Sequence, residues 1–233
     1  KTVIIFAQGI GPINSFIGIV LTKNLLKHCN YVSVRDEKSL ELLKNWGIKA
    51  DLLCDPIFSI ETNKIIKSNT VAVQLRNFRT MSEDFIDRLA QKVCKEFPDK
   101  NIEIYSFQDS IDTDICKKFE KAVNLLNPDI KTKLYYNLTN EEIIENLSKA
   151  EYLIAMRFHA IIVGLLTQAK ILAINYDIKI DKIAKEFNLP MLDLKKDFKD
   201  QFKELKTQNP AQNSLKVNTK SFNWNGFDSV INN

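Results

Sequence analysis

Short runs of apolar, β-branched residues alternate with segments of helical period along most of this chain, and this alternation limits the possible folds more than any other feature. Strands separated by helices are typical of βαβ units, whose strands lie parallel in one sheet. We therefore expect an α/β fold. The expected strands cover residues 3–7, 31–34, 50–54, 70–75, 101–107, 132–136, 152–156 and 170–175.

Helix start and stop signals lie between several of these strands. Gly47 ends the first expected helix, and Ser82 is expected to cap the second, with Asp84 in its first turn. The expected helices cover residues 36–46, 82–97, 140–150 and 160–168.

A polar segment near residues 61–69 divides the pattern into two blocks. The first block, residues 1–62, holds about three strands, so we expect the C-terminal part of a Rossmann-like domain whose N-terminal part is missing. Residues 63–206 contain five expected strands and predict a second Rossmann-like domain. Residues 207–233 are expected to form a polar tail that packs back through a few aromatic anchors.

The segment that ends the second block has helical period. Phe198, Phe202 and Leu205 fall on one face, and the edges of this face are basic. Such a stripe either associates peripherally with a membrane or packs against its own domain or the first one. Packing within the protein is the simpler alternative.

Composition excludes several classes of protein. Lys and Arg number 33 against 29 Asp and Glu, and the resulting charge of +4 is spread along the chain, so no nucleic-acid partner is expected. Four dispersed cysteines and two histidines form no metal-ligand motif, so no metal or cofactor is expected. Dispersed thiols are typical of the cytoplasm, and no apolar run approaches the roughly 18 residues of a membrane span.

Polar side chains follow three of the expected strands of the second block. Arg76, Gln108 and Arg157 each come directly after one strand, and His159 follows Arg157 at the start of a helix. Ligands of parallel α/β sheets bind beyond the carboxyl ends of the strands. We therefore expect these loops to open onto one crevice.

The chemistry of this crevice depends on its arginines. An arginine fork matches phosphate or carboxylate, and Arg76 and Arg157 would supply two such forks. A cation beside the N-terminus of a helix is favourable when an anion is bound there. In the alternative interpretation, Arg157 pairs with an acidic residue and His159 is a core histidine.

Two loops of the first block are further candidates. Gln8, Gly9 and Gly11 end the first strand in a sequence that either lets the backbone approach a ligand or simply makes a tight turn. It matches neither a dinucleotide fingerprint nor a P-loop. Arg35 could reach a crevice, whereas Asp36 or Glu37 suits the cap of the next helix.

A last candidate loop follows the strand over 170–175. Asp177 and Lys179 would bind a sugar hydroxyl there or form an ion pair with each other. The sequence favours neither alternative.

Seven short segments occur along the chain in the order and with the spacing of one protein family. They read AQGIGP at 7–12, SVRDEKS at 33–39, CDPIF at 54–58, VQLR at 73–76, FQ at 107–108, MRFHA at 156–160 and YDIK at 176–179. Together they resemble the polysaccharide pyruvyl transferase family over residues 1–194. MRFHA is the most specific segment, although Phe158 stands where the family usually has leucine.

The resemblance implies a fold and a reaction. Members of this family resemble glycosyltransferase-B enzymes, with two Rossmann-like domains. They transfer pyruvate from phosphoenolpyruvate to two hydroxyls of a sugar, as a ketal, with release of phosphate. The implied acceptor is a sugar of a lipid-linked or growing cell-surface polysaccharide, which would place the enzyme in the cytoplasm at the inner membrane face.

The resemblance also implies roles for residues. Arg76 and Arg157 would bind phosphoenolpyruvate, and His159 would act as general acid or base. The remaining candidate substrate-binding residues are Gln8, Gly9, Gly11, Arg35, Gln108, Asp177 and Lys179. Two alternatives stay open: a glycosyltransferase of the same architecture that uses a nucleotide-sugar, and a non-catalytic module that binds an anion or a glycan.

Overall fold

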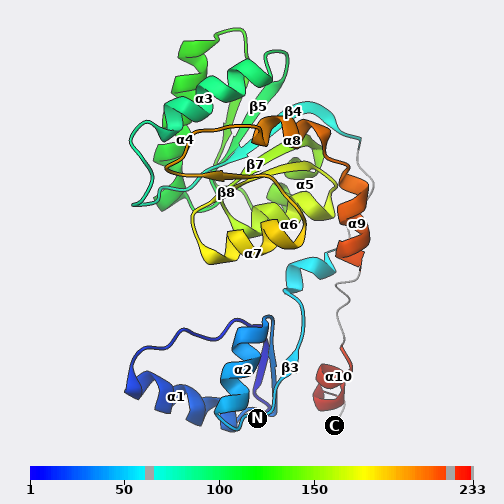
Figure 1. Cartoon of the computed structure of the whole chain (residues 1–233). Helices are drawn as coiled ribbons and strands as arrows, with labels where there is room; N and C mark the ends of the chain where they lie inside the picture. Colours follow the sequence, from blue (N-terminus) through cyan, green and yellow to red (C-terminus); the bar gives the residue numbers. More distant parts are fainter. Residues whose placement is uncertain (61–65, 219–223, 232–233) are drawn as a thin grey trace. The chain divides into compact units, whose positions relative to one another are not determined.

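The structure is a computed structural model that describes residues 1–60, 66–218 and 224–231 (Figure 1). The chain divides into two compact units. Unit 1 comprises Lys1–Ile60 and Asn218–Asn233, and unit 2 comprises Glu61–Val217. In its described residues, the segment expected as a polar tail contains two helices, and the second helix belongs to unit 1.

Unit 1 contains a parallel sheet with strand order β1-β2-β3. Its core is small and includes the fully buried Val34 of the central strand and Leu43 of the second helix. The elements of unit 1 are β1 (Ile4–Gln8), α1 (Phe16–Lys27), β2 (Tyr31–Val34), α2 (Glu37–Asn45), β3 (Asp51–Leu52), the 3₁₀ helix η1 (Pro56–Ser59) and α10 (Asn225–Ile231).

An aromatic cluster joins the two sequence-distant parts of unit 1. The ring of Phe6 on β1 stacks on Trp224 with centroids 5.2 Å apart, and it meets Phe227 of α10 edge-on at 5.1 Å. These rings bring the C-terminal helix to the first strand.

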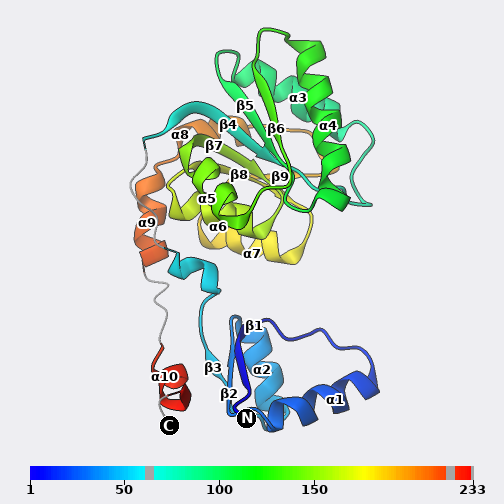
Figure 2. The same ribbon diagram turned by 180° about the vertical axis from the view of Figure 1, so that it is seen from behind.

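Unit 2 is built on a parallel sheet of strand order β6-β5-β4-β7-β8-β9 (Figure 2). Its strands are β4 (Ser68–Gln74), β5 (Asn101–Tyr105), β6 (Thr132–Tyr135), β7 (Ala150–Ala155), β8 (Lys170–Asn175) and β9 (Met191–Asp193). Its helices are α3 (Phe85–Glu96), α4 (Asp109–Leu126), α5 (Asn140–Lys149), α6 (Phe158–Leu166), α7 (Ile178–Glu186), α8 (Gln201–Thr207) and α9 (Pro210–Asn218).

Helices cover both faces of this sheet. Val71 and Val73 of β4 lie in one core with α3, α4 and α8. The intervening residues point to the opposite face, since strand side chains alternate, and α5, α6 and α7 pack there against β4, β7 and β8. Such burial on both faces explains the nearly continuous apolar strands.

The predicted α/β class is confirmed, and all eight expected strands are present. The strand β9 was missed, because three residues at a sheet edge are too short to give a pattern. The helices α1, α4 and α7 were also missed: α1 is apolar around much of its circumference, and α4 and α7 follow loop residues that we considered as ligand contacts.

The expected cap at Ser82 is wrong. The helix α3 begins at Phe85 with Asp84 at its N-cap, because the hydroxyl of Ser82 instead donates to the carbonyl of Leu194 and accepts from Arg88. The expected cap at Asp36 is confirmed, since its carboxylate accepts the backbone N–H of Ser39 at 2.9 Å.

The apolar stripe near the end of unit 2 packs within that unit. Phe202 and Leu205 of α8 are fully buried, and Phe198 meets Phe85 edge-on at 5.6 Å. The apolar stripe therefore packs against residues of its own unit. Within the described part of the chain, no helix has the length and apolarity needed to cross a membrane.

Candidate functional site

The loops after β4, β5 and β7 meet at the carboxyl edge of the sheet in unit 2. That they open onto one crevice stays a prediction. Gln74 of β4 pairs in register with Ala155 of β7, and Arg76 and Arg157 each stand two residues beyond this pair. The backbone N–H of Arg76 contacts the sulfur of Met156 at 3.2 Å. Arg76 and Arg157 thus lie side by side, just beyond the ends of two neighbouring parallel strands.

Arg157 forms a bidentate ion pair. Its Nε donates to Asp112 Oδ2 at 2.7 Å, its Nη2 to Asp112 Oδ1 at 2.8 Å, and the same Nη2 to Gln108 Oε1 at 3.2 Å. Asp112 is fully buried in the first turn of α4. The alternative in which Arg157 pairs with an acidic residue is therefore correct. The third guanidinium nitrogen of Arg157, Nη1, makes no hydrogen bond within the described residues.

The backbone of this loop is also held in place. The Oε1 of Gln74 accepts the backbone N–H of Arg157 at 2.7 Å, and its Nε2 donates to the carbonyl of Leu75 at 2.8 Å. The side chain of Gln74 is fully buried. Both polar ends of a buried amide are thereby satisfied, which fixes the start of α6 against β4.

The positive charge and the hydrogen-bond donors of Arg76 have far fewer partners than those of Arg157. Its Nη1 donates to the hydroxyl of Tyr176 at 3.4 Å, and its guanidinium carbon lies 5.8 Å from the centre of that ring. Its Nε is buried without a hydrogen-bond partner, and no carboxylate in the described ranges pairs with it. A half-buried cation with an unsatisfied donor favours binding of an anion.

His159 lies in the first turn of α6, and its side chain is exposed. Its ring meets that of Phe158 edge-on, with centroids 5.7 Å apart. The alternative of a buried core histidine is therefore wrong, and the imidazole is accessible to a ligand.

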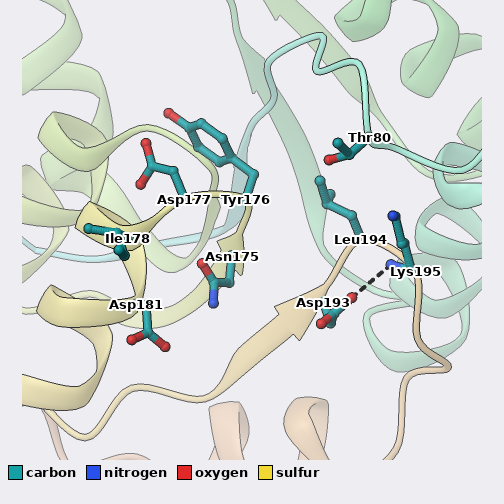
Figure 3. Close-up of a pocket in the computed structure, with 9 residues that line it drawn as sticks. All are labelled: Thr80, Asn175, Tyr176, Asp177, Ile178, Asp181, Asp193, Leu194 and Lys195. Atoms are coloured by element: carbon teal, nitrogen blue, oxygen red, sulfur yellow. Dashed lines mark hydrogen bonds between the residues drawn. The ribbon is translucent and has the colours of Figure 1, made fainter. Parts of the chain in front are cut away.

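A cleft of about 350 Å³ opens beside Tyr176, at the carboxyl ends of β8 and β9 (Figure 3). The side chains of Asn175 and Asp181 lie on one side, and those of Asp193 and Lys195 lie on the other. The residues that line it are Thr80, Asn175, Tyr176, Asp177, Ile178, Asp181, Asp193, Leu194 and Lys195. Two of its three carboxylates pair with lysines outside the lining, Asp181 with Lys185 at 2.8 Å and Asp193 with Lys196 at 3.5 Å.

Asp177 and Lys179 do not form the ion pair that was one of their alternatives. The carboxylate of Asp177 instead caps α7, accepting the backbone N–H groups of Lys179 at 2.8 Å and Ile180 at 3.0 Å. Asp177 lines the cleft, whereas Lys179 is exposed and does not. The capping of α7 therefore accounts for an aspartate at this position without any contact to a ligand.

The candidates in unit 1 also lie close to one another. Arg35 forms an ion pair with the mostly buried Asp55, and its backbone N–H donates to the carbonyl of Gln8 at 3.3 Å. A Cβ at Gly9 would lie only 3.3 Å from the Nε of Arg35, and Gly11 has a φ of +93°, so both glycines suit this turn. The turn after β1 and the side chain of Arg35 thus lie against each other.

Across residues 1–60, 66–218 and 224–231, no group of three His, Cys, Asp or Glu side chains is arranged to hold a metal ion.

A comparison with family models identifies the chain. Residues 1–178 match the model for polysaccharide pyruvyl transferase. The chain belongs to the polysaccharide pyruvyl transferase family. The match includes both arginines and the histidine of the site in unit 2. Comparison with curated proteins gave no match.

Solved structures place this pyruvyl transferase family member among glycosyltransferase-B folds. One similar structure is a mutant of S. aureus TarM in complex with Fondaparinux, alpha-GlcNAc-glycerol and UDP. It has a TM-score of 0.54 and 14% identity, with 98% of this chain and 48% of TarM covered. Another is the Methanocaldococcus jannaschii UDP-GlcNAc 2-epimerase in complex with UDP-GlcNAc and UDP. It has a TM-score of 0.51 and 13% identity, with 87% of this chain and 63% of the epimerase covered. The chain thus spans about half to two thirds of these proteins, and the likeness shows the fold alone.

Proposed function

We propose that the carboxyl edge of unit 2 binds phosphoenolpyruvate and that the protein transfers its pyruvyl group, as a ketal, to a sugar of a cell-surface polysaccharide. The observation that carries this proposal is the placement of Arg76 and Arg157 at matching positions after neighbouring strands, with a histidine two residues after Arg157. Phosphoenolpyruvate carries a phosphate and a carboxylate on one carbon, so its site needs two adjacent cationic donors.

The two arginines differ in how far a neighbouring carboxylate neutralises their charge, and this difference favours one arrangement of the two anionic groups. Arg76 has no carboxylate partner in the described chain, so it suits the phosphate, which carries more charge. Arg157 is neutralised by Asp112 and offers Nη1 as a hydrogen-bond donor, so it suits the carboxylate.

Ketal formation moves several protons. The methylene carbon of phosphoenolpyruvate gains a proton and becomes a methyl group, while positive charge develops at the central carbon. One sugar hydroxyl adds there and loses its proton, and phosphate leaves with one proton. A second hydroxyl then adds to the same carbon and loses its proton, so the two protons lost by the hydroxyls balance those gained by the methylene carbon and the phosphate. His159 is the accessible group that would deliver and accept these protons, because a histidine exchanges protons near neutral pH.

The cleft beside Tyr176 suits the acceptor sugar. Its carboxylates accept hydrogen bonds from neutral hydroxyls, and Asn175 offers both a donor and an acceptor. Tyr176 joins the two sites, since its hydroxyl contacts Arg76 while its residue lines the cleft. We place this reaction in the cytoplasm, at the membrane face where a lipid-linked acceptor would be assembled.

Turnover tests the proposal. The protein would be incubated with phosphoenolpyruvate and a mixture of cell-surface oligosaccharides, and inorganic phosphate and product masses would be measured. We expect phosphate release coupled to sugars heavier by one pyruvate less one water. A parallel incubation would supply nucleotide-sugars in place of phosphoenolpyruvate. Glycosyl transfer there, with no phosphate release from phosphoenolpyruvate, would replace the proposal with a glycosyltransferase, and binding of glycans without turnover would replace it with a binding module.

A further inference from the structure

The environment of Asp112 is unusual for a helical aspartate. Its side chain is fully buried, and both of its carboxylate oxygens accept hydrogen bonds from Arg157, at 2.7 and 2.8 Å. Its Oδ2 also accepts the backbone N–H of Gln108 at 3.1 Å. One carboxylate therefore holds the guanidinium of Arg157 and the backbone of the neighbouring loop together.

Stability alone is a weak reason for such a pair. Removing two charges from water is costly, and apolar residues of similar volume often replace buried ion pairs without loss of stability. Gln74 holds the backbone of Arg157 in addition, through its bond at 2.7 Å. Two buried polar groups from different elements thus hold one arginine, at its backbone and at its guanidinium.

The geometry points to Asp112 as a positioning residue for the site. We infer that it fixes the guanidinium of Arg157 so that Nη1, the nitrogen not bound to Asp112 or Gln108, meets the ligand in one orientation. This inference rests on the proposed binding of phosphoenolpyruvate. Asp112 has a second effect, since it neutralises Arg157 and leaves Arg76 as the uncompensated cation of the site.

Asp109 provides a matched control in the same helical turn. Its carboxylate accepts bonds from the Ser106 hydroxyl at 2.6 Å and the Asn137 backbone at 2.8 Å, and it does not contact Arg157. Asp109→Asn and Asp112→Asn each remove one negative charge near the site. If charge alone mattered, both variants would bind phosphoenolpyruvate more tightly.

Calorimetric titration of phosphoenolpyruvate into the full chain separates these effects. We expect Asp112→Asn to raise the Kd about tenfold, because it loses a charge-assisted bond that orients Arg157, and Asp109→Asn to leave the Kd unchanged or lower it. Equal behaviour of the two variants, or tighter binding in Asp112→Asn, would overturn the inference.

A double substitution covers the case in which Asp112→Asn alone does not fold. Asp112→Asn combined with Arg157→Gln leaves no unpaired buried charge. We expect this double variant to bind phosphoenolpyruvate with the same Kd as Arg157→Gln alone, because Asp112 acts through Arg157. A further loss of affinity in the double variant would contradict this.

A ligand-free measurement keeps the test separate from the proposed function. The Nε–H resonance of Arg157 in a proton–nitrogen NMR spectrum is expected to be protected from solvent exchange in the parent chain and in Asp109→Asn, but not in Asp112→Asn. Protection that persists in Asp112→Asn would overturn the inference even if phosphoenolpyruvate does not bind. Absence of phosphoenolpyruvate binding by the parent chain would count against the proposed function alone.

Discussion

At the scale of single residues, the site combines groups that differ in how much water and countercharge they meet. Arg157 is paired on two nitrogens, Arg76 has an unsatisfied buried Nε, and His159 is exposed. Binding and proton transfer are therefore assigned to different side chains. Substitutions should separate these two functions.

His159→Gln tests this separation. Glutamine retains hydrogen bonding but cannot exchange a proton near neutral pH, so we expect pyruvyl transfer to fall by about 10²–10⁴-fold. The Kd for phosphoenolpyruvate, measured by calorimetry, should stay close to that of the parent chain. Transfer at the parent rate would remove the assignment of His159 as acid or base.

The sequence predicted Arg76 and Arg157 as candidates because each directly follows a strand, but it did not predict what holds them. Asp112 lies in the segment DSIDTD with two other aspartates, and only the tertiary fold shows that it is the fully buried one. Tyr176 and Asp55 were missed for the same reason, since their partners are far away in sequence. Gln74, a polar residue directly after the apolar run 71–73, carried a signal that we did not use.

At the scale of elements, the position of the site depends on how closely α6 packs on the sheet. A Cβ on Gly164 would lie 2.6 Å from Leu153 Cδ2 and 3.0 Å from Ile171 Cδ1. The absence of a side chain therefore lets the helix approach β7 and β8. Parallel strands with crossover helices were predictable from periodicity, whereas this spacing was not.

Gly164→Ala should destabilise unit 2. Overpacking a buried contact costs about 1–3 kcal/mol, which exceeds the gain of at most about 1 kcal/mol from the higher helix propensity of alanine. Urea denaturation followed by far-UV circular dichroism measures the change. A variant as stable as the parent chain would mean that Leu153 and Ile171 move aside freely.

Lys67, at the start of unit 2, gives a prediction about pH. Its Nζ donates to the carbonyl of Ser148 at 2.9 Å, and burial lowers its pKa from 10.5 to about 8. Between these two values the unfolded chain holds a proton that the folded chain has released, so stability rises with pH in that window and the penalty is full below it.

Lys67→Met isolates this effect, because methionine does not titrate. The free energy of unfolding of the parent chain minus that of the variant should be constant below about pH 8 and should rise toward pH 10.5. Urea denaturation of both chains at several pH values measures this difference. A difference that stays flat over the whole range would show that Lys67 remains protonated in the folded chain.

At the scale of the whole molecule, two units with unequal cores share one chain. Unit 1 has a three-stranded sheet and depends on an aromatic cluster that includes the C-terminal segment. Both tryptophans, Trp46 and Trp224, belong to unit 1. Tryptophan fluorescence therefore reports the unfolding of unit 1 selectively.

Phe6→Ala should shift the unfolding of unit 1 alone. Loss of the stacked and edge-on contacts with Trp224 and Phe227 is expected to cost about 1–3 kcal/mol. The fluorescence transition should move to lower urea concentration, while the main circular dichroism transition of unit 2 should remain in place. Coincident shifts of both signals would show that the units unfold together.

We propose that the carboxyl edge of unit 2 binds phosphoenolpyruvate, and a calorimetric titration of the parent chain and of Arg76→Gln tests this proposal. We predict saturable binding of phosphoenolpyruvate to one site, preferred over a nucleoside diphosphate, with a Kd raised about 10–100-fold in Arg76→Gln because a charged donor is lost. No binding by the parent chain, a preference for the nucleotide, or equal affinity in Arg76→Gln would contradict the proposal.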